Sequence, residues 1–444
     1  MYEYIRQWPA NREMGWSHDV NGVCHDLNNW FFSQNGYLWK FPIKHRIGND
    51  CTQENRAQGI YRVNPKKNLE AWLGTSVSDV HLGDIDYYNG YVYVPVGGET
   101  SKASFRVVCF FKSDDLSYAG QQIILREDNV PFTSLGWLAI NPSDGMLYTS
   151  DKIASNVTKG SESRIHLYKI GDMTKPNPLQ FHSTAVLTDE DYLILKREHM
   201  QGGCFDNDNH LHIMNGYVTH DKGTRVSWAN SKGGISVFKV SSTPSAGYTQ
   251  TICRLTHSNQ SNGFRFQFSG TGEEPEGLTY WDLDKDTRAP EIDGQLHAIM
   301  IDNTGKGADD FFFKHYRKNA NAGFYLVTVK TGNVENAGTD AGIFITFFGE
   351  KGASNECELD SSRDDFERGH TDRFVVETDT RVGTLRQILI RSNNSGKYAE
   401  FYLESVTVWD IEANKNYVFP ANQWLTGNKK NVILTPKINQ SIKY

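Results

Sequence analysis

Several features are scarce or missing in this sequence of 444 residues, and each absence narrows what the protein can be. No run of about 18 apolar residues occurs, so we expect no membrane-spanning helix. The opening segment, MYEYIRQWPANREMGW, lacks the apolar stretch of a signal peptide, and none is visible. We therefore expect a soluble chain, secreted or released, with peripheral association to a membrane as a further option.

Basic charge and catalytic signatures are missing as well. The net charge of −7 argues against a general nucleic-acid binder, which would be basic. There is no G-x-S-x-G elbow, no H-E-x-x-H, no P-loop and no Rossmann glycine motif, so no nucleotide or organic cofactor is expected. Cysteine is sparse, with six residues and no CxxC pair. Cys24, Cys109 and Cys204 lie in apolar, strand-like runs, which predicts buried free thiols.

Aromatic residues and glycine are abundant. Aromatics make up 12% of the chain, beside 39 Gly, and aromatic runs punctuated by glycine turns are typical of an all-β protein. The length exceeds that of one ordinary core and predicts two domains. The segment 188–201, TDEDYLILKREHMQ, is the exception, because Thr188 followed by acidic residues predicts a short helix.

A weak repeat runs through the first three quarters of the chain. Five stretches share a glycine, an apolar strand, a short polar turn and a second, aromatic strand, as in NGVCHDLNNWFFSQNGYLWKFPI from Asn21. The leading glycines stand at Gly22, Gly83, Gly136, Gly203 and Gly277. Their spacing leaves room for about four strands per unit, the content of one propeller blade. We predict a five-bladed β-propeller, with six blades if one is hidden in 160–200 or 217–275, and with the N-terminal YEYI closing the ring.

A different β pattern begins after the polar segment RKNANAG. The predicted organisation is a propeller over 1–316, a linker over 317–322, an eight-stranded β-sandwich over 323–426 and a basic C-terminal tail over 427–444. The tail carries four lysines that could touch anionic lipid, although a solvated terminus is the simpler interpretation.

Residues of the second pattern carry a family resemblance. Ala337-Gly338-Thr339-Asp340-Ala341, FERG from Phe366, VGTLRQILIRSNNSG over 382–396 and FYLESVTVWD over 401–410 follow one another in register. Their order and spacing resemble the PLAT domain, the lipoxygenase-homology β-sandwich. The resemblance covers about a quarter of the chain. It implies docking to a lipid surface or a membrane-associated protein, sometimes with calcium.

The same resemblance implies a calcium site in the end loops of the sandwich. Asp340 and the Gly338 carbonyl would be oxygen ligands, joined by Asn333, Asn393 and Asn394. Family members often carry carboxylates where this chain has Asn333 and one of the amides of SNNSG. Amides ligate without adding charge, so the expected calcium affinity is reduced.

Polar side chains near the start of each predicted inner strand could converge in the channel of a propeller. The set is Asn21, His25, Asp26, His81, Asp84, Asp86, Gln201, Glu274 and Glu276, with Ser134 and Trp137 in the third unit. Such a ring could hold one Ca²⁺, with Asp84 and Glu276 as ligands, or could simply line a water-filled channel. In DNDNHLH, His210 and His212 share one strand face, which predicts either a metal site or an ordinary hairpin.

Two functions remain open from the sequence. The first is a non-enzymatic recognition protein, in which the propeller binds a protein or glycan and the sandwich docks on lipid, as in a secreted effector or toxin component. The second is a metal-dependent propeller hydrolase (a lactonase, esterase or phosphatase) that the sandwich brings to lipid. A purely structural role is a weaker third hypothesis.

Overall fold

The computed structural model describes residues 2–11, 19–47, 53–151, 162–195, 199–216, 218–221, 224–227, 234–240, 245–247, 249–254, 273–302, 310–361 and 363–437. This part of the chain is built from β-strands, with one α-helix, α1 (Lys66–Leu73), and one 3-10 turn, η1 (Arg56–Gln58). The all-β prediction is therefore confirmed. Among the described residues, no helix is both long enough and apolar enough to cross a membrane.

The first three quarters of the chain form successive antiparallel sheets. The first contains β2 (Val20–His25), β3 (Asn29–Gln34), β4 (Tyr37–Pro42) and β5 (Tyr61–Val63). The second contains β6 (Val77–Leu82), β7 (Asp86–Tyr88), β8 (Tyr91–Thr100), β9 (Ser104–Lys112) and β10 (Tyr118–Gln122). The third contains β11 (Leu135–Ile140), β12 (Met146–Asp151), β13 (Arg164–Ile170) and β14 (Leu179–Thr188).

Two further sheets follow. The fourth contains β15 (Met200–Phe205), β16 (His210–Asn215), β19 (Gly234–Lys239) and β20 (Thr249–Arg254). Parallel pairing of β20 with β14 joins the third and fourth units into one continuous eight-stranded sheet. The fifth contains β21 (Glu273–Tyr280), β22 (Leu296–Asp302), β23 (Asp310–Lys318) and the N-terminal β1 (Tyr2–Asn11). A separate hairpin is formed by β17 (Val218–Asp221) and β18 (Thr224–Ser227).

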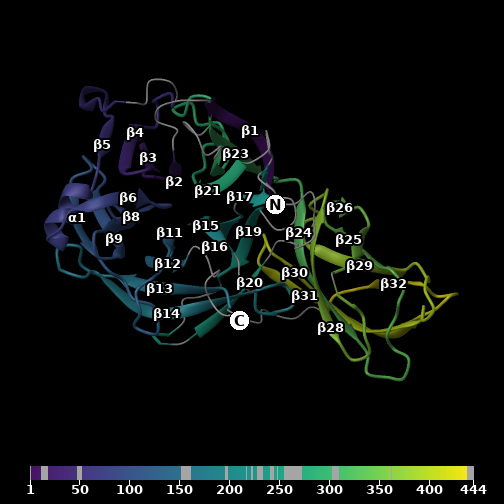
Figure 1. Ribbon diagram of the computed structural model, residues 1–444. Coiled ribbons are helices and arrows are strands. Elements are labelled where there is room, and N and C mark those ends of the chain that lie inside the picture. Colours follow the sequence, from purple (N-terminus) through teal and green to yellow (C-terminus); the bar gives the residue numbers. More distant parts are fainter. Residues whose placement is uncertain are drawn as a thin grey trace.

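The five sheets are arranged in a ring (Figure 1). Strands of neighbouring sheets contact one another in cyclic order, from β2 through β7, β11, β15 and β21 back to β2. The ring is closed by antiparallel pairing of β1 with β23, in which Tyr2 lies opposite Lys318. The sequence-based expectation that the N-terminal strand completes the last sheet is confirmed by this pairing.

The described residues of the two stretches suspected of hiding a sixth blade supply strands to existing sheets and one separate hairpin. In the described parts of 160–200 and 217–275, the strands belong to the third and fourth sheets or to the β17–β18 hairpin. The predicted helix at 188–201 is wrong for its described residues. Asp189 Oδ1 accepts hydrogen bonds from the backbone N–H groups of Asp191 and Leu193. Thr188 also forms an isolated β-bridge with Ile194, so the chain makes a turn here and not a helix.

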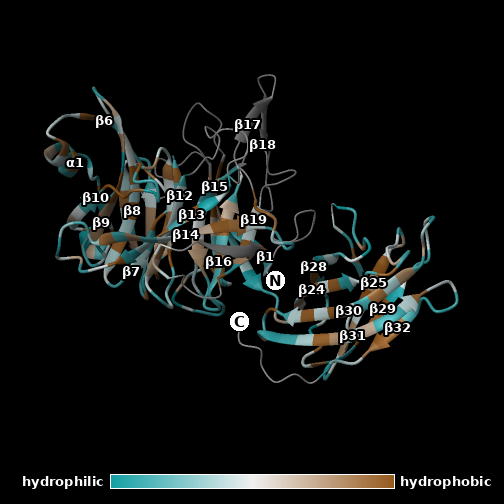
Figure 2. Cartoon of the chain, turned by 90° about the horizontal axis from the view of Figure 1, so that it is seen from below, coloured by the Kyte–Doolittle hydropathy of each residue, from teal (hydrophilic) through white to brown (hydrophobic). Residues whose placement is uncertain are grey.

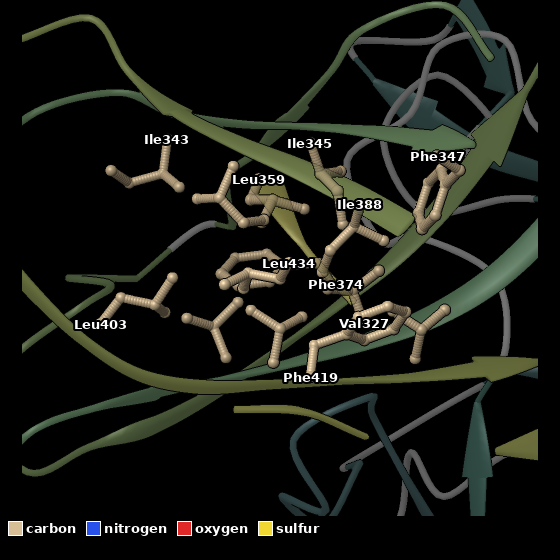
Figure 3. Packing of buried hydrophobic residues seen from close by; sticks show 14 of the residues in the cluster. Val327, Ile343, Ile345, Phe347, Leu359, Phe374, Ile388, Leu403, Phe419 and Leu434 are labelled. Carbon is tan, nitrogen blue, oxygen red and sulfur yellow. The ribbon is translucent and has the colours of Figure 1, made fainter. Parts of the chain in front are cut away.

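The last quarter of the chain is a sandwich of two sheets. One contains β24 (Gly323–Thr331), β28 (Thr371–Thr378), β30 (Phe401–Asp410) and β31 (Lys415–Leu425). The other contains β25 (Ile343–Gly349), β26 (Gly352–Ala353), β27 (Cys357–Leu359), β29 (Leu385–Ser392) and β32 (Asn431–Leu434). Alternate side chains of β25, Ile343, Ile345 and Phe347, point into a core shared by both sheets (Figure 3).

The sandwich extends beyond its predicted end at residue 426. Residues 431–434, expected to lie in a basic tail, form β32 and pair with β29. Val432 and Leu434 are buried in the core, whereas Ile433 between them is 60% exposed. The sequence did not predict this strand, because lysines and asparagines surround its short alternation of buried and exposed residues.

The outer face of the sheet that contains β24 packs on the ring (Figures 1 and 2). Phe324, Leu326, Val375, Trp409 and Ile411 share one buried apolar cluster with residues of the fourth and fifth ring sheets. At another point of the junction, Arg363 forms ion pairs with Asp189 and Asp191, and the Arg373 backbone N–H donates to Asp191. An apolar contact reinforced by ion pairs holds the two parts together.

Four described cysteines are free thiols. Cys24, Cys109 and Cys204 are buried, which confirms the prediction for these three, and Cys357 is partly buried in the sandwich. Cys51 lies outside the described residues.

Candidate functional site

The centre of the ring is closed by glycine backbone. A Cβ atom at Gly83 would lie 2.0 Å from the Gly136 carbonyl oxygen, and one at Gly277 would lie 2.6 Å from Gly22 Cα. One at Gly202 would lie 2.9 Å from Gly277 Cα. The first strands of the sheets therefore approach more closely than any side chain allows, which explains why each repeat begins with glycine.

Asp84 fills what little space remains at this centre. Its side chain is 0% exposed. Oδ1 accepts hydrogen bonds from Val23 N at 3.2 Å and Ile85 N at 3.0 Å, and Oδ2 accepts from Gly203 N at 3.0 Å and Leu278 N at 3.4 Å. The carboxylate thus ties together four sheets. Both of its oxygens are occupied by backbone donors, which leaves little capacity for a metal ion or a substrate.

A pocket of ≈230 Å³ opens at one mouth of the ring, beside the glycine contacts. Four residues predicted from the sequence line it: Asn21, His81, Ser134 and Glu276. Near the same ends of β15 and β21, the Gln201 Nε2 donates to Glu274 Oε1 at 3.1 Å. The lining also includes Asp79, Glu99 and Arg106, which the sequence analysis missed because they come from the β6 edge and the β8–β9 hairpin rather than from the repeated turn.

His25 and Asp26 lie at the opposite end of β2 from Asn21. His25 stacks on Trp281 at 4.2 Å, and its Nε2 contacts the Tyr280 carbonyl oxygen. Asp26 accepts hydrogen bonds from the backbone N–H groups of Asn28 and Asn29 and so shapes the β2–β3 turn. Trp137 is buried, with its indole N–H donating to Ser150 Oγ. The structure therefore separates the predicted set into a mouth group, the central Asp84 and a far group.

Asp86 belongs to the far group and joins two sheets. Its Oδ2 accepts a hydrogen bond from Ile140 N at 2.6 Å and its Oδ1 from Tyr87 N at 2.7 Å. Burial raises the pKa of this carboxyl group to about 7, although both backbone donors oppose the shift. The folded protein therefore holds a proton on Asp86 at pH values where the unfolded chain has lost it.

This shift predicts a pH-dependent contribution to stability. Between the unfolded pKa near 4 and the folded pKa near 7, the folded state binds more protons, so the contribution of Asp86 falls as the pH rises. The slope is at most about 1.4 kcal/mol per pH unit. The loss of unfolding free energy caused by Asp86→Asn should be larger at pH 5 than at pH 8, measured by urea denaturation of both proteins. An equal loss at both pH values would contradict the assignment.

A second and larger pocket, of ≈610 Å³, lies at the loop end of the sandwich. Gly338 and Asp340 line it, as the family resemblance implied, together with Glu335, Glu367 and Glu400. Asn333 instead accepts a hydrogen bond from Arg368 Nε at 3.0 Å. Asn393 accepts from Gly342 N, Ser395 N and Ser395 Oγ, and Asn394 adopts a positive φ of 57° in the same turn.

The side-chain oxygens of Asn333 and Asn393, expected to help complete a calcium shell, thus hold the loops together. In the described part of the chain, only one group of three acidic or histidine side chains brings its ligand atoms within 4.8 Å of one another, and it lies in the ring. That group contains neither amide nor backbone carbonyl ligands, so the calcium site of the sandwich loops stays a prediction. Asp340, with Oδ2 accepting from Tyr398 N at 3.3 Å, is the one carboxylate among the five predicted calcium residues.

The same loop end carries exposed apolar side chains that the sequence analysis did not single out. Tyr398 is 60% exposed and Val334 is 41% exposed. The Tyr398 backbone is fixed because its carbonyl oxygen accepts hydrogen bonds from Asp340 N and Thr339 Oγ1. Its ring is therefore displayed by an ordered loop, beside the side chains of Lys397 and Arg368.

The group of converging ligand atoms in the ring is Asp206, Asp208 and His210, in the turn between β15 and β16. His210 Nδ1 lies 3.2 Å from Asp206 Oδ2, and His212 Nε2 lies 4.0 Å from the same oxygen. The structure thus brings together the two histidines of the DNDNHLH segment and two of its aspartates.

Comparisons with known proteins match the sandwich. The PLAT/LH2 domain family matches residues 325–437. The human lipoxygenase homology domain-containing protein 1 is 42% identical over 101 residues, and mouse polycystin-1-like protein 3 is 34% identical over 122 residues. These matches cover 23% and 26% of this chain but only 5% and 6% of those relatives.

Among solved structures, a coral 8R-lipoxygenase, described as activated by calcium through a C2-like domain, is 31% identical with a TM-score of 0.24. That similarity covers 26% of this chain and 17% of the lipoxygenase chain. The sequence order of the sandwich, its two packed sheets and the family match agree with one another. Residues 325–437 of this chain are a PLAT/LH2 domain.

Proposed function

We propose that this chain is a recognition protein whose PLAT/LH2 domain docks on a lipid surface through the loops that carry Val334 and Tyr398. The observation that carries this proposal is the exposure of both apolar side chains at one end of the sandwich. Aromatic side chains with a polar tip favour the boundary between lipid and water. Trp409 and Ile411, at the other end of the sheet, contact the ring. Docking through the loops therefore leaves the contact between ring and sandwich intact.

Charge at this end predicts which lipid is needed. The pocket beside Tyr398 is lined by four carboxylates and only two basic side chains, those of Arg368 and Lys397. An anionic surface therefore gains little from electrostatic attraction, and burial of the apolar tips must supply most of the binding energy. We expect vesicles of neutral phosphatidylcholine to suffice, with little dependence on calcium, because the side-chain oxygens of Asn333 and Asn393 are occupied within the loops.

The ring is, in this proposal, a five-bladed β-propeller over residues 1–316, joined to the sandwich through 317–322. The cyclic contacts of the five inner strands support that architecture. The propeller would bind a protein or glycan ligand at the mouth lined by Asn21, His81 and Glu276. The hydrolase alternative would use Asp84 and Glu276 to hold a metal ion, and the four backbone donors on Asp84 count against it.

Vesicle co-sedimentation of the full chain tests the docking proposal. The double variant Val334→Ala/Tyr398→Ala should bind neutral vesicles about 10-fold or more weakly, because each large apolar side chain contributes about 1.5 kcal/mol or more on burial. Leu27→Ala is a matched control, since Leu27 is 78% exposed on the ring. It should bind as the unmodified protein does.

Three outcomes would count against this proposal. Failure of the unmodified chain to sediment with neutral or anionic vesicles, with calcium or with EDTA, would make the sandwich a protein-docking domain. A strict requirement for calcium would show that the loops rearrange around an ion. Equal binding of the double variant would place the contact elsewhere, and Ile433→Ala would then test the outer face of β32, where Ile433 is 60% exposed.

A further inference from the structure

The turn between β15 and β16 gathers four side chains whose chemistry is that of transition-metal ligands. Asp206, Asp208 and His210 bring their ligand atoms within 4.8 Å of one another. His212, two residues along β16, places Nε2 4.0 Å from Asp206 Oδ2. Two imidazoles and two carboxylates form a nitrogen and oxygen set that suits zinc and its neighbours in the periodic table better than calcium, which prefers oxygen alone.

The two oxygens of Asp206 have different tasks. Oδ1 accepts hydrogen bonds from Asp208 N at 2.9 Å and His210 N at 2.8 Å, which fixes the turn. Oδ2 is directed between the imidazoles, 3.2 Å from His210 Nδ1 and 4.0 Å from His212 Nε2. Ligand atoms around a tetrahedral zinc ion with bonds near 2.1 Å are about 3.4 Å apart, so these separations need only small adjustments.

The tautomer of His212 favours the same conclusion. Its Nδ1 faces the His210 carbonyl oxygen at 3.3 Å, and a carbonyl can only accept, so Nδ1 carries the hydrogen. Nε2 of the same ring then lies on the side of the Asp206 carboxylate, 4.0 Å from Oδ2. A backbone carbonyl that orients an imidazole through its second nitrogen is the usual arrangement at protein metal sites.

The site is reachable from solvent and already attracts one cation. Asp206 and His212 are buried, whereas Asp208 is exposed and forms an ion pair with Lys318 Nζ at 2.6 Å. Lys318 is the last residue of β23, shortly before the sandwich begins at Gly323. A metal ion would compete with this ammonium group for Asp208.

We propose that Asp206, Asp208, His210 and His212 bind one divalent transition-metal ion of the zinc class at the β15–β16 turn, with Lys318 as the competing cation of the metal-free form. His210 Nδ1 now shares a hydrogen with Asp206 Oδ2, so this hydrogen must move to Nε2 when Nδ1 binds metal. Binding also displaces the Lys318 ammonium group from Asp208. The site is separate from the PLAT/LH2 loops and from the mouth of the ring.

Isothermal titration calorimetry of the EDTA-treated full chain with ZnCl₂ tests the proposal. We expect binding of one zinc ion per chain. His210→Gln and Asp208→Asn should each weaken zinc binding by at least about 10-fold, since loss of even an outer partner of a metal ligand costs that much. Lys318→Gln should leave zinc affinity unchanged or raise it.

The control variant is Asp172→Asn, because Asp172 is likewise a turn aspartate, accepting from Thr174 N, but lies between β13 and β14. It should bind zinc normally, and circular dichroism would confirm that every variant is folded. Binding of cobalt(II) gives a second readout, because a thiolate charge-transfer band would assign the metal to cysteine and overturn the proposal. Absence of zinc binding, equal binding by His210→Gln and Asp208→Asn, or tighter binding of calcium than of zinc would each overturn it as well.

Discussion

Replacing Gly83 by Ala is expected to cost about 4 kcal/mol of unfolding free energy or more, or to abolish folding. The added methyl group would lie 2.0 Å from the Gly136 carbonyl oxygen and 2.7 Å from its carbon. Both are backbone atoms of the neighbouring sheet, so relief requires two sheets to move apart, not one side chain to rotate. Urea denaturation followed by tryptophan fluorescence would measure the loss.

Two further glycine variants sharpen this test. Gly277→Ala should behave like Gly83→Ala, since its Cβ would lie 2.6 Å from Gly22 Cα. Gly427→Ala is the matched control, because no atom lies closer than 3.8 Å to the added carbon and the residue is outside the ring. A Gly83→Ala protein that unfolds at the same urea concentration as the control would show that the sheets do not meet at these glycines.

The second large effect is expected at Asp84. Substitution by Ala leaves the backbone N–H groups of Val23, Gly203 and Leu278 without their acceptor inside a closed ring. Each buried donor that loses its partner costs about 1–3 kcal/mol, so we expect Asp84→Ala to lose about 3 kcal/mol or more. The Asp84→Asn protein should also be less stable. In the native protein both carboxylate oxygens accept hydrogen bonds from backbone N–H groups, and in the variant one of these oxygens is replaced by an amide N–H₂ group, which cannot accept them.

The outcome at Asp84 also discriminates between the two functional hypotheses. Burial raises the pKa of this carboxyl group well above its ordinary value, with the backbone donors of Gly203, Val23 and Leu278 opposing the shift. A carboxylate kept for catalysis despite that cost would leave the protein equally stable or more stable when removed. If the Asp84 carboxylate instead holds the sheets together, its removal should make the protein less stable. Asp172→Asn, at an exposed turn, should change the urea midpoint little and serves as the control.

The contact between ring and sandwich fixes how the two parts are oriented to each other. Phe324 and Trp409 of the sandwich are buried against the ring, and Arg363 is ion-paired with Asp189 and Asp191. A domain that docks on lipid through the opposite loops would therefore hold the ring at a defined orientation to the surface. Weakening of the ring at Gly83 should leave the PLAT/LH2 core intact, since that core is a separate apolar cluster.

The comparison of sequence and structure is clearest at the repeat. Turns such as NG and DG and the alternation of apolar residues predicted the strands, the ring-like repeat and the N-terminal strand that pairs with β23. Alternation also predicted the strands of the sandwich, and motifs such as AGTDA from Ala337 and FERG from Phe366 carried the family resemblance. The local signals failed at 188–201, where the helix signal from Thr188 was overridden by the Asp189 turn and by the contact with Arg363, a residue far along the chain.

The candidate sites were predicted less completely than the fold. Asn21, His81 and Glu276 do meet in one pocket, but Asp84 is an anchor between sheets, and Asn333 and Asn393 hold loops together. Residue type and spacing could not separate these roles. Whether a polar side chain faces a ligand or a backbone donor depends on which distant segment lies against it.

The sequence by itself determined the local features of this protein: strands, hairpin turns and the repeated glycines. These follow from interactions between residues a few positions apart, which the sequence records directly. The sequence also determined the PLAT/LH2 domain, through motifs whose order and spacing resemble that family over residues 337–410. Only the tertiary structure decided why the glycines are needed, which carboxylates are buried and how the two parts are joined. Those outcomes depend on close packing and desolvation between segments that are more than 50 residues apart, as between Val23 and Asp84, and no local pattern encodes them.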